Sequence, residues 1–160
     1  MMKRTRLVIL AVVLMGAVAV TASAKGSGWA VGGEVSLMIG DTGGLPAFGM
    51  VTFHVPQIPL MFGVGISSSS PLVVGATVDY WFAHGNLSSL FSWYAGVGGY
   101  LQAGGDTTAV GGRIPLGLQV WPVGSTLEIF AELAPAVGVT LAPTAFALHV
   151  QGAAGLRVWL

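Results

Sequence analysis

The chain has 160 residues, of which 54% are hydrophobic and only 8% are charged, with 25 glycines, 8 prolines and no cysteine. About a quarter of the residues of an average soluble domain are charged, so this composition excludes a disordered chain and a nucleic-acid-binding surface. The lack of cysteine excludes disulfides, thiol catalysis, zinc-thiolate sites and lipid attachment to a cysteine. The length fits one domain.

The N-terminus has the features of a secretory leader. Three basic residues precede an apolar run over 7–20, and Ala22-Ser23-Ala24 has the small-residue pattern of a signal-peptidase site. The apolar run is shorter than the roughly 20 residues of a membrane-spanning helix, which argues against the alternative of a single N-terminal anchor. We therefore expect a cleaved signal peptide over 1–24 and a mature domain over 25–160.

Long stretches of the mature chain carry no charge at all. None lies between Asp41 and Asp79, or between Asp79 and Asp106. Such stretches suit a lipid environment better than water, but frequent proline and glycine disfavour transmembrane helices. Pro135 and Pro143 interrupt even the most helix-like run. The remaining structure that satisfies its backbone groups in a bilayer is a closed β-barrel.

The mature chain divides into eight stretches of strand-like sequence separated by turn residues. An even number of strands brings both termini to the same side, as in bacterial single-chain outer-membrane barrels. The sequence predicts an all-β fold, an eight-stranded antiparallel transmembrane β-barrel of up-and-down topology, which we take as a monomer by default. The expected strands are Trp29–Ile39, Phe48–Val55, Leu60–Ser67, Leu72–Phe82, Phe91–Gln102, Gly112–Trp121, Leu127–Val137 and Phe146–Leu160.

When each strand is read with period two, every strand charge falls opposite the apolar face. Arg157 shares a face with His149 and Gln151, and Arg113 shares one with Gln119. An arginine on the lipid face near the midplane would cost about 2–4 kcal/mol. The expected lumen-facing polar residues are Glu34, His54, Asp79, Arg113, Glu128, Glu132, His149 and Arg157.

We expect the lumen charges to be paired, because unpaired buried charges are costly and an eight-stranded barrel is just wide enough for side chains to fill. Strand adjacency pairs Arg113 with Glu128 or Glu132, and Arg157 with Glu34 across the closing seam. A narrow pore or proton path is the alternative, favoured by the free volume that lumen-facing glycines would leave: Gly63, Gly65, Gly75, Gly96, Gly98 and Gly117.

A soluble barrel with an apolar interior shows the same alternation with its faces reversed. Its outer face would then hold just six charges among many glycine, alanine and serine residues, which is too few for a solvated surface. The aromatic residues favour the membrane alternative. Those expected to face lipid near the periplasmic ends form an interfacial girdle: Trp29, Phe53, Tyr80, Phe82, Phe91 and Trp93. Trp81, Trp121 and Trp159 point inward as plugs of the lower lumen.

No catalytic, cofactor or metal site emerges from the sequence. A membrane-barrel lipid hydrolase or acyltransferase would have to use Ser67–Ser70 with His54 or His149, and nothing in their spacing selects them. Two isolated acids, Asp41 and Asp106, make a poor calcium site. We therefore expect a non-enzymatic protein without cofactors.

The chain ends on Gly155-Leu156-Arg157-Val158-Trp159-Leu160, which resembles the signal that barrel-assembly machinery reads. Gly155, Val158 and Leu160 occupy its pattern positions, although the pattern prefers a terminal aromatic. This resemblance implies periplasmic chaperones and the assembly machinery as partners.

Segments 93–100, 113–120 and 128–133, together with this last strand, resemble small eight-stranded outer-membrane barrels of the OmpA-transmembrane, OmpX and OmpW type, and most closely the spirochaetal outer-membrane β-barrel family. The resemblance implies a bacterial outer-membrane location, contact with outer-membrane lipid, and a surface role in which loops bind a host protein or the barrel passes a small hydrophobic ligand. The expected outer loops are short and hold two charges: 40–47, 68–71, 103–110 and 138–145. A structural or surface-interaction role with a filled lumen is the leading expectation, and a narrow channel for small solutes or hydrophobic molecules is the alternative.

Overall fold

The computed structural model describes residues 28–40, 47–68, 70–141 and 144–160. These residues form nine antiparallel strand segments: β1 (Ala30–Gly40), β2 (Ala47–Val55), β3 (Ile58–Ser67), β4 (Val74–Asn86), β5 (Phe91–Gly104), β6 (Thr107–Arg113), β7 (Leu116–Val123), β8 (Leu127–Leu141) and β9 (Thr144–Trp159). Within the described ranges no helix is long and apolar enough to span a membrane.

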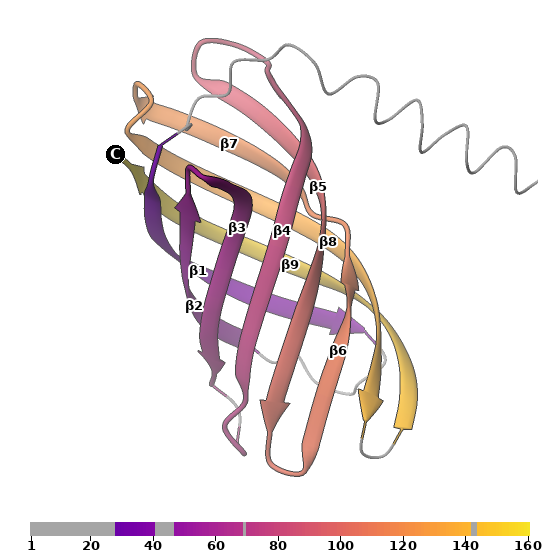
Figure 1. Cartoon of the computed structure of the whole chain (residues 1–160). Helices are drawn as coiled ribbons and strands as arrows, with labels where there is room; N and C mark the ends of the chain where they lie inside the picture. Colours follow the sequence, from indigo (N-terminus) through magenta and orange to yellow (C-terminus); the bar gives the residue numbers. More distant parts are fainter. Residues whose placement is uncertain (1–27, 41–46, 69, 142–143) are drawn as a thin grey trace, which may run out of the picture.

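The strands close into a barrel (Figure 1). Apart from β6 and β7, consecutive strands pair with each other, and β1 pairs with β9 over the full length of β1. β6 and β7 occupy one position between β5 and β8, so the nine segments form eight staves. The predicted all-β, eight-stranded, antiparallel barrel with up-and-down topology is confirmed.

The sixth strand differs from the prediction, because a single strand over 112–121 was expected. The structure breaks it into β6 and β7 at Ile114 and Pro115, where proline has no N–H to give to the ladder. The neighbouring strands bridge the break, since Gly96 N donates to Pro115 O at 2.9 Å and Ile114 N donates to Pro135 O at 3.0 Å. The inward and outward alternation continues unchanged through the break.

The two ends of the barrel differ. The start of β1 and the end of β9 lie at one end, here called the terminal end, with the turns at 56–57, 87–90 and 124–126. The opposite loop end holds the β3–β4 connection and the tight turn between β5 and β6. Gly105 in that turn has a φ of 56°, the left-handed region that glycine enters without strain.

The loop-end hairpins are tighter than expected from the sequence. Loops over 103–110 and 138–145 were expected, but β5 runs to Gly104, β6 begins at Thr107, β8 runs to Leu141 and β9 begins at Thr144. The residues involved are largely small, threonine or β-branched, and they continue the ladder rather than leave it. The loop expected at 40–47 falls mostly outside the described residues.

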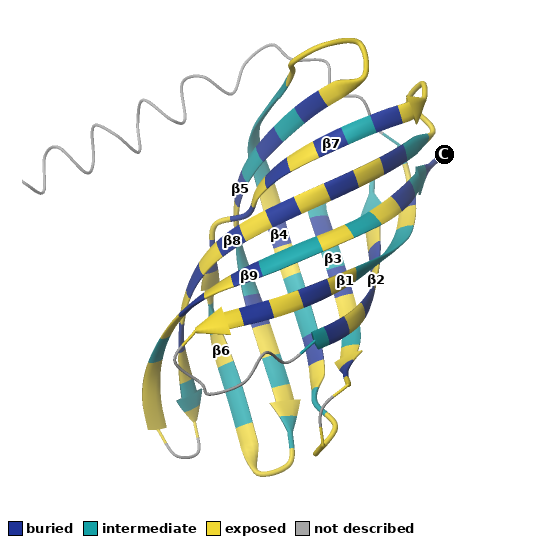
Figure 2. Ribbon diagram, turned by 180° about the vertical axis from the view of Figure 1, so that it is seen from behind, coloured by how far each residue is buried: buried dark blue, intermediate teal, exposed yellow. Residues whose placement is uncertain are grey.

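Buried and more exposed residues alternate along much of the barrel wall (Figure 2). Along β8 buried and exposed residues succeed each other almost without exception. The polarity is the reverse of a soluble protein: Leu133 is 59% exposed on the outside, while Glu128 and Arg157 are 0% and 2% exposed inside. Apolar side chains therefore face the surroundings, and the charged side chains of the strands lie in the interior together with buried aromatic and aliphatic residues.

Candidate functional site: the polar network inside the barrel

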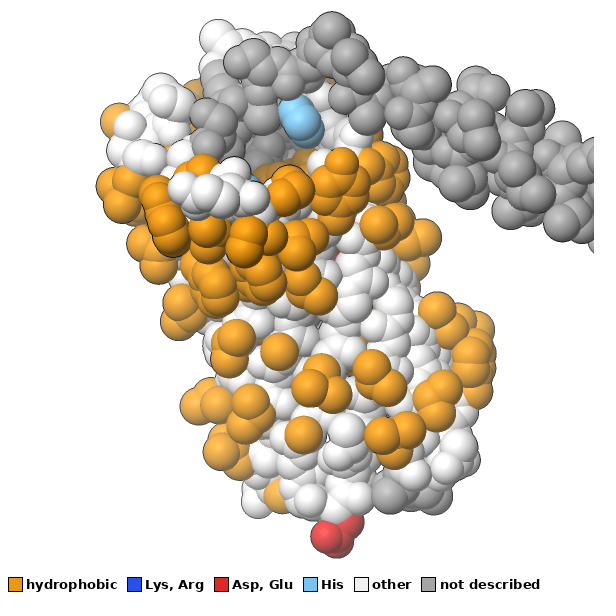
Figure 3. All heavy atoms as spheres, in the orientation of Figure 1, with side chains coloured by type: hydrophobic (Ala, Val, Ile, Leu, Met, Phe, Trp, Pro, Cys, Tyr) orange, Lys and Arg blue, Asp and Glu red, His pale blue; other side chains and the backbone are white. Residues whose placement is uncertain are grey.

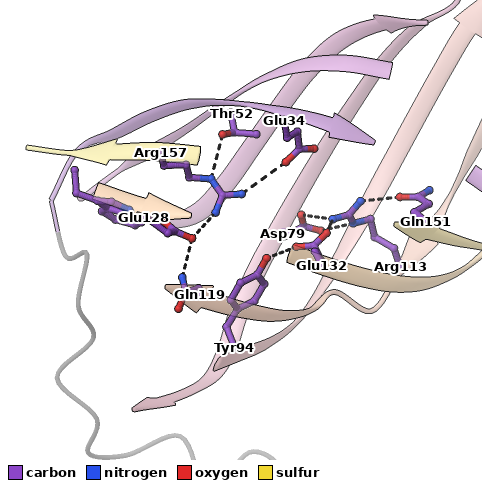
Figure 4. Close-up of polar contacts among 11 residues, drawn as sticks. Glu34, Thr52, Asp79, Tyr94, Arg113, Gln119, Glu128, Glu132, Gln151 and Arg157 are labelled. Carbon is purple, nitrogen blue, oxygen red and sulfur yellow. Dashed lines mark hydrogen bonds and ion pairs between the residues drawn. The ribbon is translucent and has the colours of Figure 1, made fainter. Parts of the chain in front are cut away.

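The charged side chains of the interior gather around two arginines, and we name the two groups the Arg157 cluster and the Arg113 cluster (Figure 4). The Arg157 cluster contains Arg157, Glu128, Glu34, Thr52 and Gln119. The Arg113 cluster contains Arg113, Asp79, Glu132, Tyr94 and Gln151. Strands from all around the barrel contribute, so the two clusters tie the wall together across its lumen.

Arg157 lies between two carboxylates. Its Nη1 donates to Glu128 Oε1 at 2.9 Å, its Nη2 is 3.7 Å from Glu34 Oε2, and its Nε donates to Thr52 Oγ1 at 3.1 Å. The guanidinium carbon also lies 3.6 Å from the ring centroid of Phe130, close enough for a cation–π contact. Charge pairing and ring stacking together hold this guanidinium in one position.

Three donors converge on the carboxylate of Glu128. Besides Arg157, Gln119 Nε2 donates to Oε1 at 2.9 Å and Trp159 Nε1 donates to Oε2 at 2.6 Å. Charge-assisted hydrogen bonds of this kind are about twice as strong as neutral ones. The buried carboxylate is therefore fully satisfied.

Arg113 forms a fork-on-fork pair with Asp79. Its Nε donates to Oδ1 at 2.9 Å and its Nη2 donates to Oδ2 at 3.1 Å. Nη2 also pairs with Glu132 Oε1, and Nη1 donates to Gln151 Oε1 at 2.6 Å. Tyr94 completes the cluster by donating its hydroxyl to Glu132 Oε2 at 2.5 Å. Planar, bidentate geometry of this kind suits arginine and not lysine.

Each arginine reaches a partner two strands away across a glycine. Gly98 of β5 lies in register between Arg113 and Asp79, and a Cβ there would collide with Asp79 Oδ1. Gly32 of β1 lies in register between Arg157 and Thr52, and a Cβ there would be 2.7 Å from Arg157 Cγ. Because these two positions have no side chain, each guanidinium group can extend across the intervening strand to its partner.

Tryptophans close the lumen at the terminal end. Trp121 and Trp159 are buried, pack with Ala30 and Met61, and contact the half-buried Trp81. Trp121 is also anchored by a hydrogen bond from its Nε1 to Ser92 Oγ at 2.7 Å. The tryptophans expected to point inward thus lie together on the lumen side.

The exposed aromatic side chains lie on the opposite, outer face. Trp29, Phe53, Tyr80 and Phe91 are exposed there, whereas Phe82 and Trp93 are half-buried.

The remaining lumen glycines do not leave open volume. The ring of Tyr94 lies directly over Gly117, and Phe48 and Met50 cover Gly75 and Gly63, where an added Cβ would be 3.0 Å and 3.2 Å from them. A cavity of about 20 Å³, lined in part by Ser36, Thr77 and Gln102, lies on the loop-end side of the clusters. That volume is close to the size of one water molecule. The free space that the glycines suggested is thus occupied by large neighbouring side chains.

The two histidines expected in the lumen lie apart from each other. His54 is at the terminal end, where its Nδ1 is 2.8 Å from Gly28 O and its ring is 5.3 Å from that of Trp159. His149 is buried in the loop half, where Gln151 Nε2 is 3.1 Å from its Nε2 and Tyr100 meets its ring edge-on. Neither histidine belongs to an ion pair in the described structure.

The ion pairs agree in part with those expected from the sequence. Of the two partners expected for Arg113, it is Glu132 that lies beside it, while Glu128 pairs with Arg157. Glu34 faces Arg157 across the β1–β9 seam. Sequence reasoning did not assign Asp79 to Arg113, and it missed the parts played by Thr52, Tyr94, Ser92, Gln119 and Gln151. All five lie on the inner face by period two, which is the signal that could have found them.

Ser67, His54 and His149, which were considered for catalysis, have other contacts in the described residues. His54 is at the terminal end, far along the barrel from Ser67 at the end of β3, and the Nε2 of His149 is engaged with Gln151. Ser67 itself accepts the N–H of Val73 at 3.0 Å. Among these residues no group of three or more His, Asp and Glu side chains is placed to hold a metal ion.

The terminal hexapeptide continues the wall as part of β9. Gly155 faces inward beside Phe130, and Val158 pairs with Val31 of β1 and Leu127 of β8. Leu160 is 81% exposed and donates its N–H to Trp29 O at 2.8 Å. The expected leader over 1–24, with Lys25, lies outside the described residues.

Comparison with solved structures gives a match to the crystal structure of Neisserial surface protein A (NspA), with a TM-score of 0.58 and 14% sequence identity. The match covers 82% of this chain and 97% of the other. No protein-family model and no curated protein matches the chain. At this level of identity the likeness concerns the fold.

Proposed function

We propose that the protein is a non-enzymatic β-barrel of the outer membrane of a double-membraned bacterium, with a structural or surface-interaction role and a lumen closed by side chains. The observation that carries the proposal is the reversed polarity of the barrel. Arg113, Arg157 and four carboxylates form its core, and aliphatic side chains form its outside. The fold likeness to a neisserial surface protein supports the same location.

The outer face of the barrel exposes many apolar side chains, and their contact with water would be unfavourable. Val35, Leu118 and Leu148 are 60%, 58% and 61% exposed, and they belong to a surface that is apolar on every strand. Contiguous apolar patches on soluble monomers rarely exceed a few hundred Å². A bilayer removes this surface from water, and the closed sheet leaves no backbone edge to the lipid.

The packed lumen supports the structural role over the channel. The tryptophans close the terminal end, the two clusters fill the middle, and the lumen glycines are covered by Tyr94, Phe48 and Met50. Large side chains occupy the space beside these glycines, and this supports a closed lumen over the alternative of a narrow channel for small solutes or hydrophobic molecules. A role of the loops in binding a host protein, and the closer resemblance to the spirochaetal family, stay predictions.

We further propose that the leader over 1–24 is cleaved on export and that periplasmic chaperones and the barrel-assembly machinery handle the unfolded chain. The apolar outward residues of the last strand, including Leu156 and Leu160, support recognition of that strand. Deleting residues 155–160 should leave the protein in the periplasm.

The experiment that tests the proposed function combines location with conductance. Membrane fractionation should place the protein in the outer membrane with Lys25 at its N-terminus. The purified barrel in planar bilayers should show no single-channel current, and it should not turn over a lipid substrate. Steady unitary currents would favour the channel, and lipid turnover would favour an enzyme.

A further inference from the structure

Both arginines of the barrel strands point into its interior. The sequence after residue 24 has three basic residues, Lys25, Arg113 and Arg157. Arg113 and Arg157 are 6% and 2% exposed, and their guanidinium groups are occupied by carboxylates. Lys25 lies outside the described residues and precedes β1, whose start is at the terminal end. Among the described residues, the loop end therefore has no lysine or arginine side chain that faces its surroundings.

The rim of the loop end is neutral or acidic. Its exposed residues are aliphatic, such as Ile39 and Leu141, or uncharged and polar, such as Ser68, Thr107 and Thr144. Asp106, in the turn between β5 and β6, is exposed, and among the described residues it is the charged side chain of this rim. On the face shown in Figure 3 an acidic side chain protrudes at this end and no Lys or Arg side chain is visible.

The terminal end has a different chemistry. Trp29, Tyr80 and Phe91 are exposed there at 53%, 44% and 46%, and the indole and phenol groups can bond to lipid head groups whatever their charge. Among the described residues, Phe146 is the exposed aromatic side chain of the loop end. In the proposed membrane the barrel thus presents an aromatic girdle to one leaflet, and to the other a rim of aliphatic and uncharged polar residues with the acidic Asp106.

We infer that the loop end is built for a leaflet of lipids with no net negative charge on their head groups. This inference rests on the proposed function. Each lysine or arginine near an anionic membrane surface is worth about 1 kcal/mol, or about a fivefold change in partitioning. An anionic head group at this rim finds no such residue, and it meets the carboxylate of Asp106 instead. Neutral head groups meet no electrostatic penalty.

The test measures folding of the chain from Lys25 into two kinds of vesicle. One is made of phosphatidylcholine, and the other replaces about a third of it by anionic phosphatidylglycerol. The folded fraction is read by gel mobility without boiling and by protection from trypsin, at low and at high salt. We expect equal or lower folding in the anionic vesicles, with no loss of folding when salt is raised.

A matched variant shows that the assay responds to cations at the rim. Thr107→Lys and Thr144→Lys add two lysines at exposed loop-end positions, and together they should raise partitioning into anionic over neutral vesicles about 25-fold. High salt should cancel this gain, because it shortens the range of the interaction. If the double variant folds poorly, Thr107→Lys alone should give about a fivefold gain.

The outcomes separate the inference from the proposed function. Folding of the natural chain that rises several-fold with anionic lipid and falls with salt would overturn the inference while leaving the membrane barrel intact. Failure to fold in either kind of vesicle, with a protein that stays soluble without lipid, would overturn the proposed function itself.

Discussion

Arg113 pairs with two of the four interior carboxylates, Asp79 and Glu132, and it also donates to Gln151. Replacing it by methionine leaves two carboxylates buried without a counter-charge. We expect Arg113→Met to lower the free energy of unfolding by about 3–5 kcal/mol, the usual cost of removing one partner of a buried pair. The measurement is the urea midpoint of the barrel in detergent or vesicles, followed by tryptophan fluorescence.

Two further variants give this measurement its controls. Arg113→Lys keeps the charge but not the fork that meets Asp79, so its loss should be intermediate. Asp106→Asn removes an exposed charge from the loop end and should change stability by no more than about 0.5 kcal/mol. Equal stability of Arg113→Met and the natural protein would show that the cluster contributes nothing to the fold.

We expect a side chain at Gly98 to destabilise the barrel about as much as the loss of Arg113, because Gly98 lies in register between Arg113 and Asp79. A Cβ at this position collides with Asp79 Oδ1 and presses on Val78 O, so Gly98→Ala must separate Asp79 from Arg113. Overpacking typically costs about 1–3 kcal/mol, and the disturbed ion pair places this variant at about 3 kcal/mol. Gly49→Ala is the matched control, because no atom lies within 4 Å of its Cβ position and a strand alanine is favoured over glycine. A neutral Gly98→Ala would contradict the account of the Arg113 cluster.

At the scale of single residues, the sequence predicts the face of a side chain better than its partner. Period two places Asp79 and Arg113 inside, but their meeting depends on the stagger of β4, β5 and β6, which no local pattern encodes. The glycines show the same limit. Gly98 and Gly117 are visibly on the inner face, yet only the packed structure shows that Asp79 and Tyr94 occupy the space beside them.

At the scale of the strand, the outward face of β7 separates a membrane barrel from a soluble one. Leu116, near the middle of the sixth stave, is 48% exposed. Leu116→Arg should cost about 2–4 kcal/mol in a bilayer, because arginine near the midplane is poorly solvated. Val123→Arg, at the terminal end of the same strand, should cost about 0–1 kcal/mol. Unfolding in vesicles measures both, and equal costs would mean that lipid does not surround this strand.

Strand existence follows from the alternation of the sequence, whereas strand ends and interruptions do not. The break at Pro115 was missed because alternation passes through it unchanged, with Arg113 and Gln119 on the same face on either side. At the loop end the expected strands stop too soon before each turn and resume too late after it, because glycine and threonine near Gly105 are typical of loops. In a barrel their backbone groups gain more from continuing the ladder than from ending it.

At the scale of the whole molecule, the predicted architecture is confirmed because several independent constraints agree. Six charges on one face of their strands, an even number of strands and termini that meet at one end allow little besides a closed barrel with a polar interior. The packing of the lumen could not be predicted in the same way. It depends on which large side chain covers which glycine, and that is settled by tertiary contacts.

In the proposed arrangement the closed barrel has lipid outside and charged side chains inside. Gel mobility of the protein refolded in detergent, with and without boiling, tests it most directly, because closed membrane barrels resist SDS until they are heated. We predict a faster band before boiling and a slower band at the unfolded position after it. A protein that stays soluble without detergent and runs identically in both lanes would contradict the claim and would mean that the two faces of the sheet are assigned the wrong way round.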